Sequence, residues 1–283
     1  MKKGINYWSF PGGLEGKKDF AAAVKDAKDL GFQGIEVCLF TDGPLSIEMS
    51  DADVAKLKQT LDGAGIEAAS VTCGALWDNQ LTSSDPKKRE MGKHIVTRCL
   101  EIAGKLGASG ILVVPGSVET FFMPDAEIVQ YDVALQRVEE AAKALAPVAE
   151  KNRVAIGIEN VWNKLFMSPV EARDFVDKIG SEYVGWFFDV GNILALGFPE
   201  QWITILGKRI KKVHLKDYRK AVGTINGFVD LLEGDVNWPA VMTALKSVGY
   251  NDYLIAEMIP GYTFAPETRL ANTSLAMDKI LAM

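Results

Sequence analysis

Residue types that often form cross-links or bind metals are scarce in this chain of 283 residues, which has three cysteines and two histidines. The cysteines, Cys38, Cys73 and Cys99, are odd in number and far apart in the sequence. They therefore form neither a disulfide framework nor a CxxC metal site. We expect them to be small buried side chains in a reducing compartment.

Long apolar runs and an excess of positive charge are also missing. No stretch is long and apolar enough for a membrane span, and the N-terminal segment has no apolar core of a signal peptide. The net charge of −6 disfavours nucleic acid and anionic membranes as partners, because both would repel the protein. The sequence thus predicts a cytoplasmic protein without nucleic-acid or membrane partners, and its charge is compatible with binding a cation.

The chain does contain a regular alternation of short apolar runs and longer amphipathic segments. The apolar runs are residues 3–10, 32–40, 66–74, 110–116, 153–160, 183–192, 210–217 and 252–258. Several of the amphipathic segments begin with Ser, Asp or Pro and end with Gly, as helices do. Eight strand–helix units predict an α/β fold, a (β/α)8 TIM barrel, with residues 1–283 as one domain. An open doubly wound sheet is disfavoured because no GxGxxG turn follows the first strand.

Polar residues end the last four predicted strands, where the active sites of barrels lie. They are Glu159, Asp189, His214 and Glu257. In three of these strands the aliphatic residues alternate and should face the helices, which turns both glutamates and the histidine inward. The strand before the aspartate is apolar on both faces, but this aspartate fits the same layer. A single acidic residue at a strand end commonly caps a helix or pairs with lysine, so the prediction depends on all four.

Three carboxylates at one barrel mouth would repel one another, and a divalent cation removes that conflict. Three oxygen donors and one imidazole suit Mn²⁺, Mg²⁺ or Co²⁺, with Zn²⁺ as a further candidate. The pattern therefore predicts one divalent metal ion as cofactor. The other histidine, His94, lies within a helical pattern, and we interpret it as a structural or surface residue.

Several segments of the chain resemble the sugar phosphate isomerase/epimerase superfamily, the xylose isomerase-like TIM barrels. The segments include GIEN, FFDVGN, KKVHLKDY and LEGDVNWPAVMTALKSVGYNDYLIAE, and the resemblance covers essentially the whole chain. The ketose 3-epimerase branch is the most similar in its metal-ligand pattern. That resemblance implies that Glu159, Asp189, His214 and Glu257 bind one metal ion. It also implies that the two glutamates are catalytic and move a proton between the faces of the reacting carbon.

The resemblance further implies substrate contacts after the sixth and seventh strands. Arg219 stands near the position of a substrate-binding arginine, one residue short in spacing, and Asn192 stands where the epimerases carry a histidine. The second difference leaves reactions other than simple ketose 3-epimerisation open. A homodimer or homotetramer is compatible with the sequence, which does not specify the assembly.

Other residues are expected to contact the substrate because of their places on the predicted strands. Lys216 shares the inward face of its strand with the histidine, and Glu36 ends the second strand. Trp8 and Trp77 follow the first and third strands, where aromatic faces suit the C–H surfaces of sugars. The long segment from residue 218 to 237 is expected to cover the metal, since long loops are usually functional.

These residues fit proton abstraction next to a carbonyl group, with a metal-stabilised enediolate and two glutamates as proton carriers. The sequence predicts a metal-dependent sugar isomerase or epimerase that acts on a ketose or keto-sugar. A dehydratase or lyase on a keto-inositol or 3-keto-sugar is the main alternative, and a sugar-binding barrel without catalysis is another. The AP endonucleases of the same superfamily need several histidines for three zinc ions, which this chain lacks. No glycine-rich phosphate cradle is present, which favours a non-phosphorylated sugar.

Overall fold

The computed structural model describes residues 1–120, 122–123 and 126–283, and in it eight parallel strands close into a barrel. The strands are β1 (Lys2–Asn6), β2 (Gly34–Leu39), β3 (Glu67–Cys73), β4 (Gly110–Val113), β5 (Ala155–Glu159), β6 (Val184–Asp189), β7 (Ile210–Leu215) and β10 (Tyr253–Ala256). Their order around the barrel is β1, β10, β7, β6, β5, β4, β3, β2. This arrangement confirms the predicted (β/α)8 barrel.

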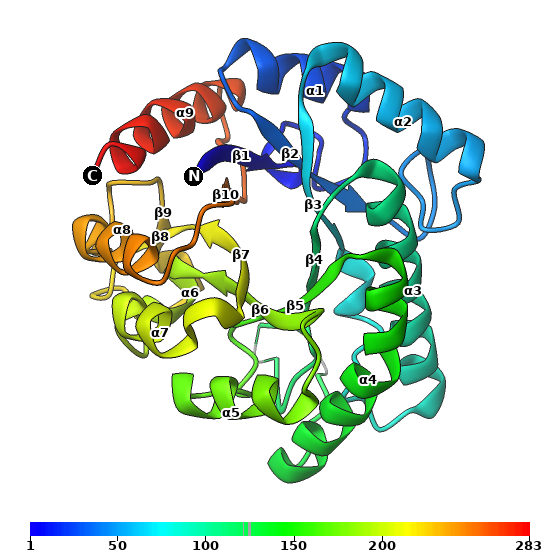
Figure 1. Ribbon diagram of the computed structural model, residues 1–283. Helices are drawn as coiled ribbons and strands as arrows, with labels where there is room; N and C mark the ends of the chain where they lie inside the picture. Colours follow the sequence, from blue (N-terminus) through cyan, green and yellow to red (C-terminus); the bar gives the residue numbers. More distant parts are fainter. Residues whose placement is uncertain (121, 124–125) are drawn as a thin grey trace.

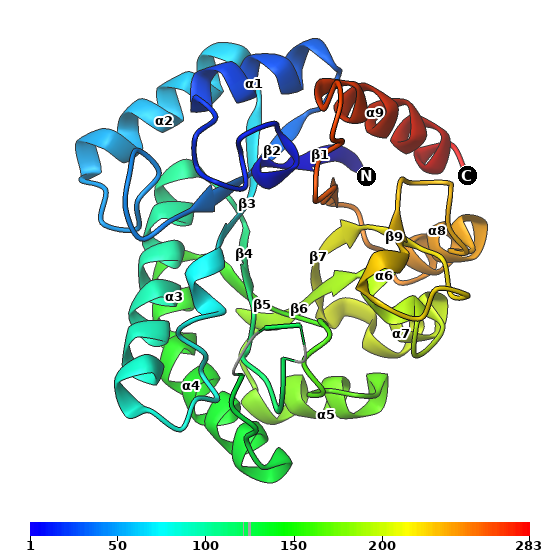
Figure 2. The same cartoon turned by 180° about the vertical axis from the view of Figure 1, so that it is seen from behind.

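Helices form a ring around the strands (Figure 1). They are α1 (Phe20–Asp29), α2 (Asp51–Ala64), α3 (Pro86–Leu106), α4 (Tyr131–Asn152), α5 (Pro169–Ile179), α7 (Pro199–Leu206), α8 (Trp238–Ser247) and α9 (Glu267–Leu281), and a short α6 (Val190–Leu194) follows β6 directly. The start of α5 shows the expected cap, with the Ser168 hydroxyl accepting from the Glu171 amide. None of the described helices is long and apolar enough to cross a membrane. The C-terminus, at the end of α9, lies near the N-terminus, at the start of β1 (Figure 2).

Burial of the strands on both faces explains their continuous apolar runs. Every residue of β2, β4, β5 and β6 is buried, as expected for parallel strands covered by helices. The three cysteines are unpaired and buried, as predicted from their number and spacing. Burial strongly raises the pKa of the Cys38 and Cys99 thiols, so these thiols are unreactive packing groups.

Two short turns place aromatic side chains at the C-terminal ends of β1 and β3. The first apolar run does not continue as a strand to Phe10, because the Asn6 side chain accepts a hydrogen bond from the Trp8 amide (2.7 Å). That bond starts a 3₁₀ turn at Tyr7–Ser9. A second 3₁₀ turn, Gly74–Leu76, follows β3 and leads to Trp77.

The long segment after β7 is folded around one buried carboxylate. It contains an antiparallel pair, β8 (Asp217–Tyr218) and β9 (Phe228–Val229), which lies beside α6 (Figure 2). The Asp217 carboxylate accepts hydrogen bonds from the amides of Tyr218 (2.9 Å), Leu232 (3.0 Å) and Val236 (3.2 Å) and from the Trp238 indole (3.0 Å). These bonds hold the β8–β9 hairpin at the C-terminal end of the barrel.

Candidate metal centre

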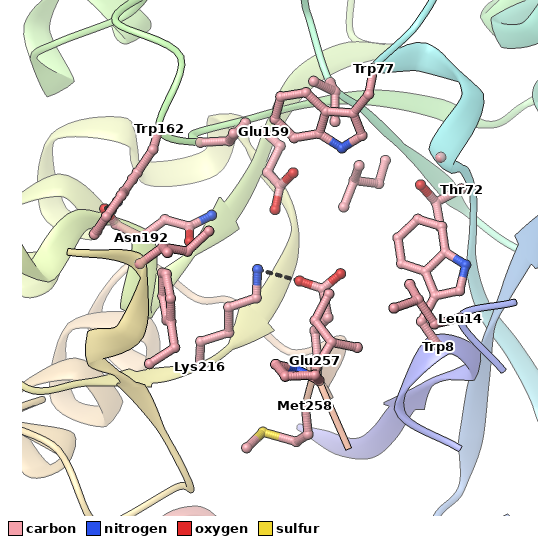
Figure 3. Close-up of a pocket in the computed structure, with 18 of the residues that line it drawn as sticks. Trp8, Leu14, Thr72, Trp77, Glu159, Trp162, Asn192, Lys216, Glu257 and Met258 are labelled. Atoms are coloured by element: carbon pink, nitrogen blue, oxygen red, sulfur yellow. Dashed lines mark hydrogen bonds and ion pairs between the residues drawn. The ribbon is translucent and has the colours of Figure 1, made fainter. Parts of the chain in front are cut away.

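Four neighbouring strands bring the predicted metal ligands together at the barrel mouth. Glu159 ends β5, Asp189 ends β6, His214 lies on β7 and Glu257 follows β10. The register pairs the aspartate directly with the histidine. Each of the four buried side chains offers one possible ligand atom, and these atoms all lie within 4.8 Å of one another. The two glutamates point into a cavity from different sides (Figure 3).

The orientation of the His214 ring is set by a carboxylate below it. Its Nε2 atom lies 2.9 Å from Glu36 Oε1, and the Glu36 side chain is also bonded to Asn6 and Ser70. Phe187 packs against the imidazole with ring centroids 4.5 Å apart. With Nε2 directed at Glu36, the ring presents Nδ1 to the barrel mouth, as a metal-binding histidine with a carboxylate partner does.

Two polar atoms of this cluster lack hydrogen-bond partners. His214 Nδ1 lies 3.7 Å from Glu159 Oε1, 3.7 Å from Glu257 Oε2 and 3.9 Å from Asp189 Oδ2, which is too far for hydrogen bonds. Among the described residues neither that nitrogen nor Asp189 Oδ2 takes part in a hydrogen bond, and Asp189 Oδ2 is contacted by Lys216 Nζ at 3.1 Å. An unsatisfied buried polar atom costs about 1–3 kcal/mol. A cation bound between the four side chains would satisfy both atoms, so the residues fit a divalent metal.

Lys216 places a positive charge next to the carboxylates of the cluster. Its Nζ atom contacts Glu257 Oε2 and lies 3.1 Å from Asp189 Oδ2. Burial acts to lower the pKa of this lysine, but the carboxylates, Asp189 foremost, outweigh burial and raise it. One lysine thus faces three carboxylates.

The carboxylates of the cluster differ in their pKa values. Burial raises the pKa of Glu159 to about 7, and His214 and Lys216 offset only part of that effect. Burial likewise raises the pKa of Asp189. Burial also acts on Glu257, but direct contact with Lys216 outweighs it and keeps the pKa below its usual value. The two glutamates that face the cavity are therefore unequal as acids.

A cavity of about 870 Å³ opens above the cluster. Glu159, Glu257 and Lys216 form part of its lining, together with Asn192. The side-chain amide of Asn192 donates a hydrogen bond to the backbone carbonyl of Asn160 (3.0 Å). Trp8 and Trp77 line the cavity across from Lys216 and Asn192, with the glutamates between (Figure 3). Four of the residues predicted to contact the substrate therefore line this cavity, and their contact with a substrate stays a prediction.

Arg219 and Glu36, also expected at the substrate, lie elsewhere. Arg219 extends from the hairpin towards Glu233, with Nη2 3.2 Å from Oε1, and it is not among the residues that line the cavity. Glu36 is fully buried below the cluster, where it contacts His214 instead of the cavity. His94, interpreted as a surface residue, pairs with Glu48 on the protein surface (2.8 Å).

Sequence reasoning missed Asn160 and Trp162. The Asn160 side chain accepts hydrogen bonds from the Asp189 amide (3.0 Å) and the Trp186 indole (3.0 Å) and donates to the Asp189 carbonyl. It therefore fixes the backbone that carries Asp189, and its adjacency to Glu159 in the GIEN segment was the available signal. Trp162 packs against Phe228 of the hairpin and lines the cavity.

Comparison with known proteins agrees with this architecture. Residues 24–279 match the family model described as xylose isomerase-like TIM barrel. Because the match covers most of the chain, the protein belongs to this family, as the sequence motifs indicated.

Two curated relatives are distant. The uncharacterized protein MJ1311 of Methanocaldococcus jannaschii is 25% identical to this chain over a match that covers 62% of the chain. The match spans 59% of the length of MJ1311. The 2-epi-5-epi-valiolone 7-phosphate 2-epimerase of an Actinoplanes species is 24% identical over 76% of this chain and 72% of its own.

Solved structures share the fold over nearly the full length. The D-psicose 3-epimerase of Clostridium cellulolyticum H10, solved with D-tagatose, has a TM-score of 0.80 and 21% identity, covering 99% of each chain. The 3-keto-D-glucoside 4-epimerase YcjR of E. coli has a TM-score of 0.79 and 17% identity over all of both chains. The IOLI protein, solved with a zinc atom, has a TM-score of 0.79 and 17% identity, covering 100% of this chain and 98% of its own.

Proposed function

We propose that this protein is a divalent-metal-dependent sugar epimerase or isomerase that moves a proton next to a carbonyl group of a ketose or keto-sugar. The observation that carries the proposal is the convergence of three carboxylates and one histidine below an open cavity, with His214 Nδ1 left without a hydrogen bond. Membership of the xylose isomerase-like family supports it. The epimerase activities named for the valiolone phosphate enzyme and D-psicose 3-epimerase point to the same reaction class.

Glu159, Asp189, His214 and Glu257 would hold the cation. The oxygen-rich donor set favours Mn²⁺, Mg²⁺ or Co²⁺, and the zinc atom of the IOLI protein keeps Zn²⁺ among the candidates. When bound, the cation would act as a Lewis acid that makes the carbon next to the carbonyl more acidic. Glu36 would keep His214 in the tautomer that presents Nδ1.

The two glutamates are suited to carry the proton. They come from β5 and β10, the outer two of the four adjacent strands, so they reach a substrate from different sides. Lys216 keeps Glu257 ionised as a proton acceptor. Burial raises the pKa of Glu159 to about 7 in the metal-free protein, and a bound cation would lower it. Both glutamates would then be carboxylates able to accept the proton.

The remaining cavity residues would position the sugar. Trp8 and Trp77 present aromatic surfaces to the cavity, which suit the apolar parts of a bound substrate. Asn192 and Lys216 lie on the other side (Figure 3), close enough to the glutamates to bind hydroxyl or carbonyl oxygens of the reacting end.

Hydrogen exchange at carbon tests the proposal directly. We expect the protein with Mn²⁺ in D₂O to incorporate deuterium next to the carbonyl of D-fructose, D-psicose or D-tagatose, as followed by NMR. A chelator should abolish the exchange. Glu257→Gln should reduce the rate at least about 100-fold, because a positioned proton carrier typically contributes 10²–10⁴-fold.

Glu90→Gln is the matched control, because Glu90 is an exposed carboxylate that pairs only with the neighbouring Lys93. Its exchange rate should equal that of the unmodified protein. If no ketose or keto-sugar exchanges a carbon-bound proton in the presence of any of the four metals, the proposal is wrong. Formation of an ultraviolet-absorbing enone without epimer would instead indicate the dehydratase or lyase.

A further inference from the structure

The cavity is large for a single sugar ring. Its volume of about 870 Å³ lies near the upper end of the ~300–1,000 Å³ range of pockets that enclose drug-sized ligands. A free hexose at the glutamates would leave part of this volume unfilled.

The cavity lining includes five large apolar side chains, four of them aromatic, together with Thr41, Thr72 and Asp78. We refer to Trp8, Leu14, Phe40, Trp77 and Phe122 as the aromatic wall; all five line the cavity. The rings of Trp77 and Phe122 meet edge to face, with centroids 5.5 Å apart. Leu14 is 47% exposed and Phe122 is 38% exposed. Large apolar side chains that remain exposed around a cavity mark a surface for an apolar ligand.

The cavity offers no free positive charge for a phosphate. Among the described residues, its cationic side chains are Lys216 and Arg269. Lys216 contacts the carboxylates of the cluster, at the end where the reacting carbon would lie. Arg269 pairs with Asp230 (2.8 Å) and bonds to the Pro260 carbonyl. The far end of the cavity therefore fits an uncharged group.

From these observations we infer that the substrate is a glycoside: a keto-sugar at the metal centre whose uncharged aromatic or apolar second group packs on the aromatic wall. This inference rests on the proposed function and narrows its substrate class. Burial of an aromatic ring between tryptophan side chains would supply affinity in proportion to the apolar area removed from water. A free ketose lacks that group, and a sugar phosphate would carry its charge into an apolar region.

Affinities of simple glycosides test the inference without turnover. Calorimetric titration of the Mg²⁺-loaded protein would compare methyl β-D-glucoside, phenyl β-D-glucoside, glucose and glucose 6-phosphate. We expect the phenyl glycoside to bind at least about tenfold more tightly than the methyl glycoside, a difference of about 1.4 kcal/mol. Glucose 6-phosphate should bind no more tightly than glucose.

Variants of the aromatic wall locate the effect. Trp77→Ala and Trp8→Ala should each remove most of the advantage of the phenyl group and leave the affinity for Mg²⁺ unchanged. The control is Phe198→Ala, an aromatic residue that is 58% exposed and does not line the cavity. It should keep the full advantage.

Three results would overturn the inference: no binding of the phenyl glycoside or no advantage for it, tighter binding of the phosphate, or an advantage that survives both tryptophan variants. A change of oligomeric state in the tryptophan variants, with the phenyl advantage intact, would identify the wall as a contact between copies of the chain. Failure here is separable from failure of the proposed function. Deuterium exchange into free ketoses would persist if only the glycoside assignment were wrong.

Discussion

Lys212 on β7 and Lys216, which follows β7 directly, lie at opposite ends of the barrel interior. Lys212 lies at the N-terminal end, where its Nζ atom is 2.8 Å from Asp252 Oδ2, and Lys216 lies at the C-terminal end among three carboxylates. Burial lowers the pKa of Lys212, and the opposite effect of Asp252 offsets only part of that decrease. At Lys216 the carboxylates outweigh burial and raise the pKa.

The difference between the two ends is one of charge balance. At the N-terminal end Lys212 pairs with one carboxylate, that of Asp252. At the C-terminal end Lys216 lies next to Asp189 and Glu257, with Glu159 in the same cluster, and His214 Nδ1 has no hydrogen bond. Barrels commonly use the N-terminal face for stability and the C-terminal face for activity. Here the same residue type occurs at both ends, and the number of neighbouring carboxylates differs between them.

Replacing each of the two lysines in turn should give the largest difference between the two ends of the barrel. Lys216→Met removes the lysine that contacts Asp189 and Glu257, and we expect the metal-free protein to lose about 3 kcal/mol of unfolding free energy. Mn²⁺ should restore most of that loss, because the metal takes over the charge balance. Lys212→Met should also destabilise, but Mn²⁺ should stabilise it no more than it stabilises the unmodified protein. Urea unfolding with and without Mn²⁺ measures both. Equal rescue of both variants would contradict the distinction between the two ends.

Removing one aspartate from each end gives the next largest effect. Asp189→Asn withdraws a metal ligand, and metal affinity should fall at least about 100-fold, since even residues that only support ligands contribute 10–100-fold. Asp252→Asn, at the other end, should leave metal affinity unchanged. Calorimetric titration with Mn²⁺ compares them. Unchanged affinity in Asp189→Asn would show that the aspartate is not a ligand.

The sequence was most informative where strand alternation is clear. Branched aliphatic residues alternate around Glu159, His214 and Glu257, so their inward direction followed from period two. The apolar strand before Asp189 carries no such alternation, and its place was inferred from its neighbours. Lys212 shares the parity of His214, yet its role was not evident because its partner, Asp252, lies on a strand distant in sequence.

The parts that could not be predicted depend on loop geometry. Strands β8 and β9 have two residues each, too few for a periodic signal, so the hairpin was expected only as a loop. Arg219 lies on that hairpin and turns to Glu233 instead of the cavity. Glu36 faces inward as expected, but only the structure distinguishes a residue that supports His214 from one that reaches the cavity.

Glu36 provides a test of how far the C-terminal site extends below its ligands. Glu36→Gln weakens the bond that holds His214 in one tautomer, and metal affinity should fall about 10- to 100-fold. Ser70→Ala removes one of the groups bonded to Glu36 and keeps the carboxylate, so its effect should be smaller. Calorimetry with Mn²⁺ distinguishes the two. If the glutamine variant binds metal as tightly as the unmodified protein, Glu36 has no positioning role.

A smaller effect should appear in the pH dependence. As the pH rises, the stability of the metal-free protein should fall and its affinity for metal should rise. Glu159 has a folded-state pKa of about 7, above the usual value of about 4.3 for a glutamate in an unfolded chain. Its contribution to the stability of the metal-free protein is therefore fully present below pH ~4.3 and is lost as the pH rises through ~7. Metal binding needs the ionised carboxylate, so metal affinity should rise up to about tenfold per pH unit across the same window.

The increase in melting temperature on adding Mn²⁺ should therefore grow from pH 5.5 to pH 7.5, within the window that the Glu159 pKa defines. Glu159→Gln removes one of the titrating groups and should make the trend less steep, because His214 and Asp189, whose pKa values are also raised, remain. Asp252→Asn, at the balanced end of the barrel, should leave it unchanged. A metal-induced shift that is constant over this range would mean that Glu159 is already ionised in the metal-free protein, and that Lys216 balances more of the negative charge than the pKa of Glu159 implies.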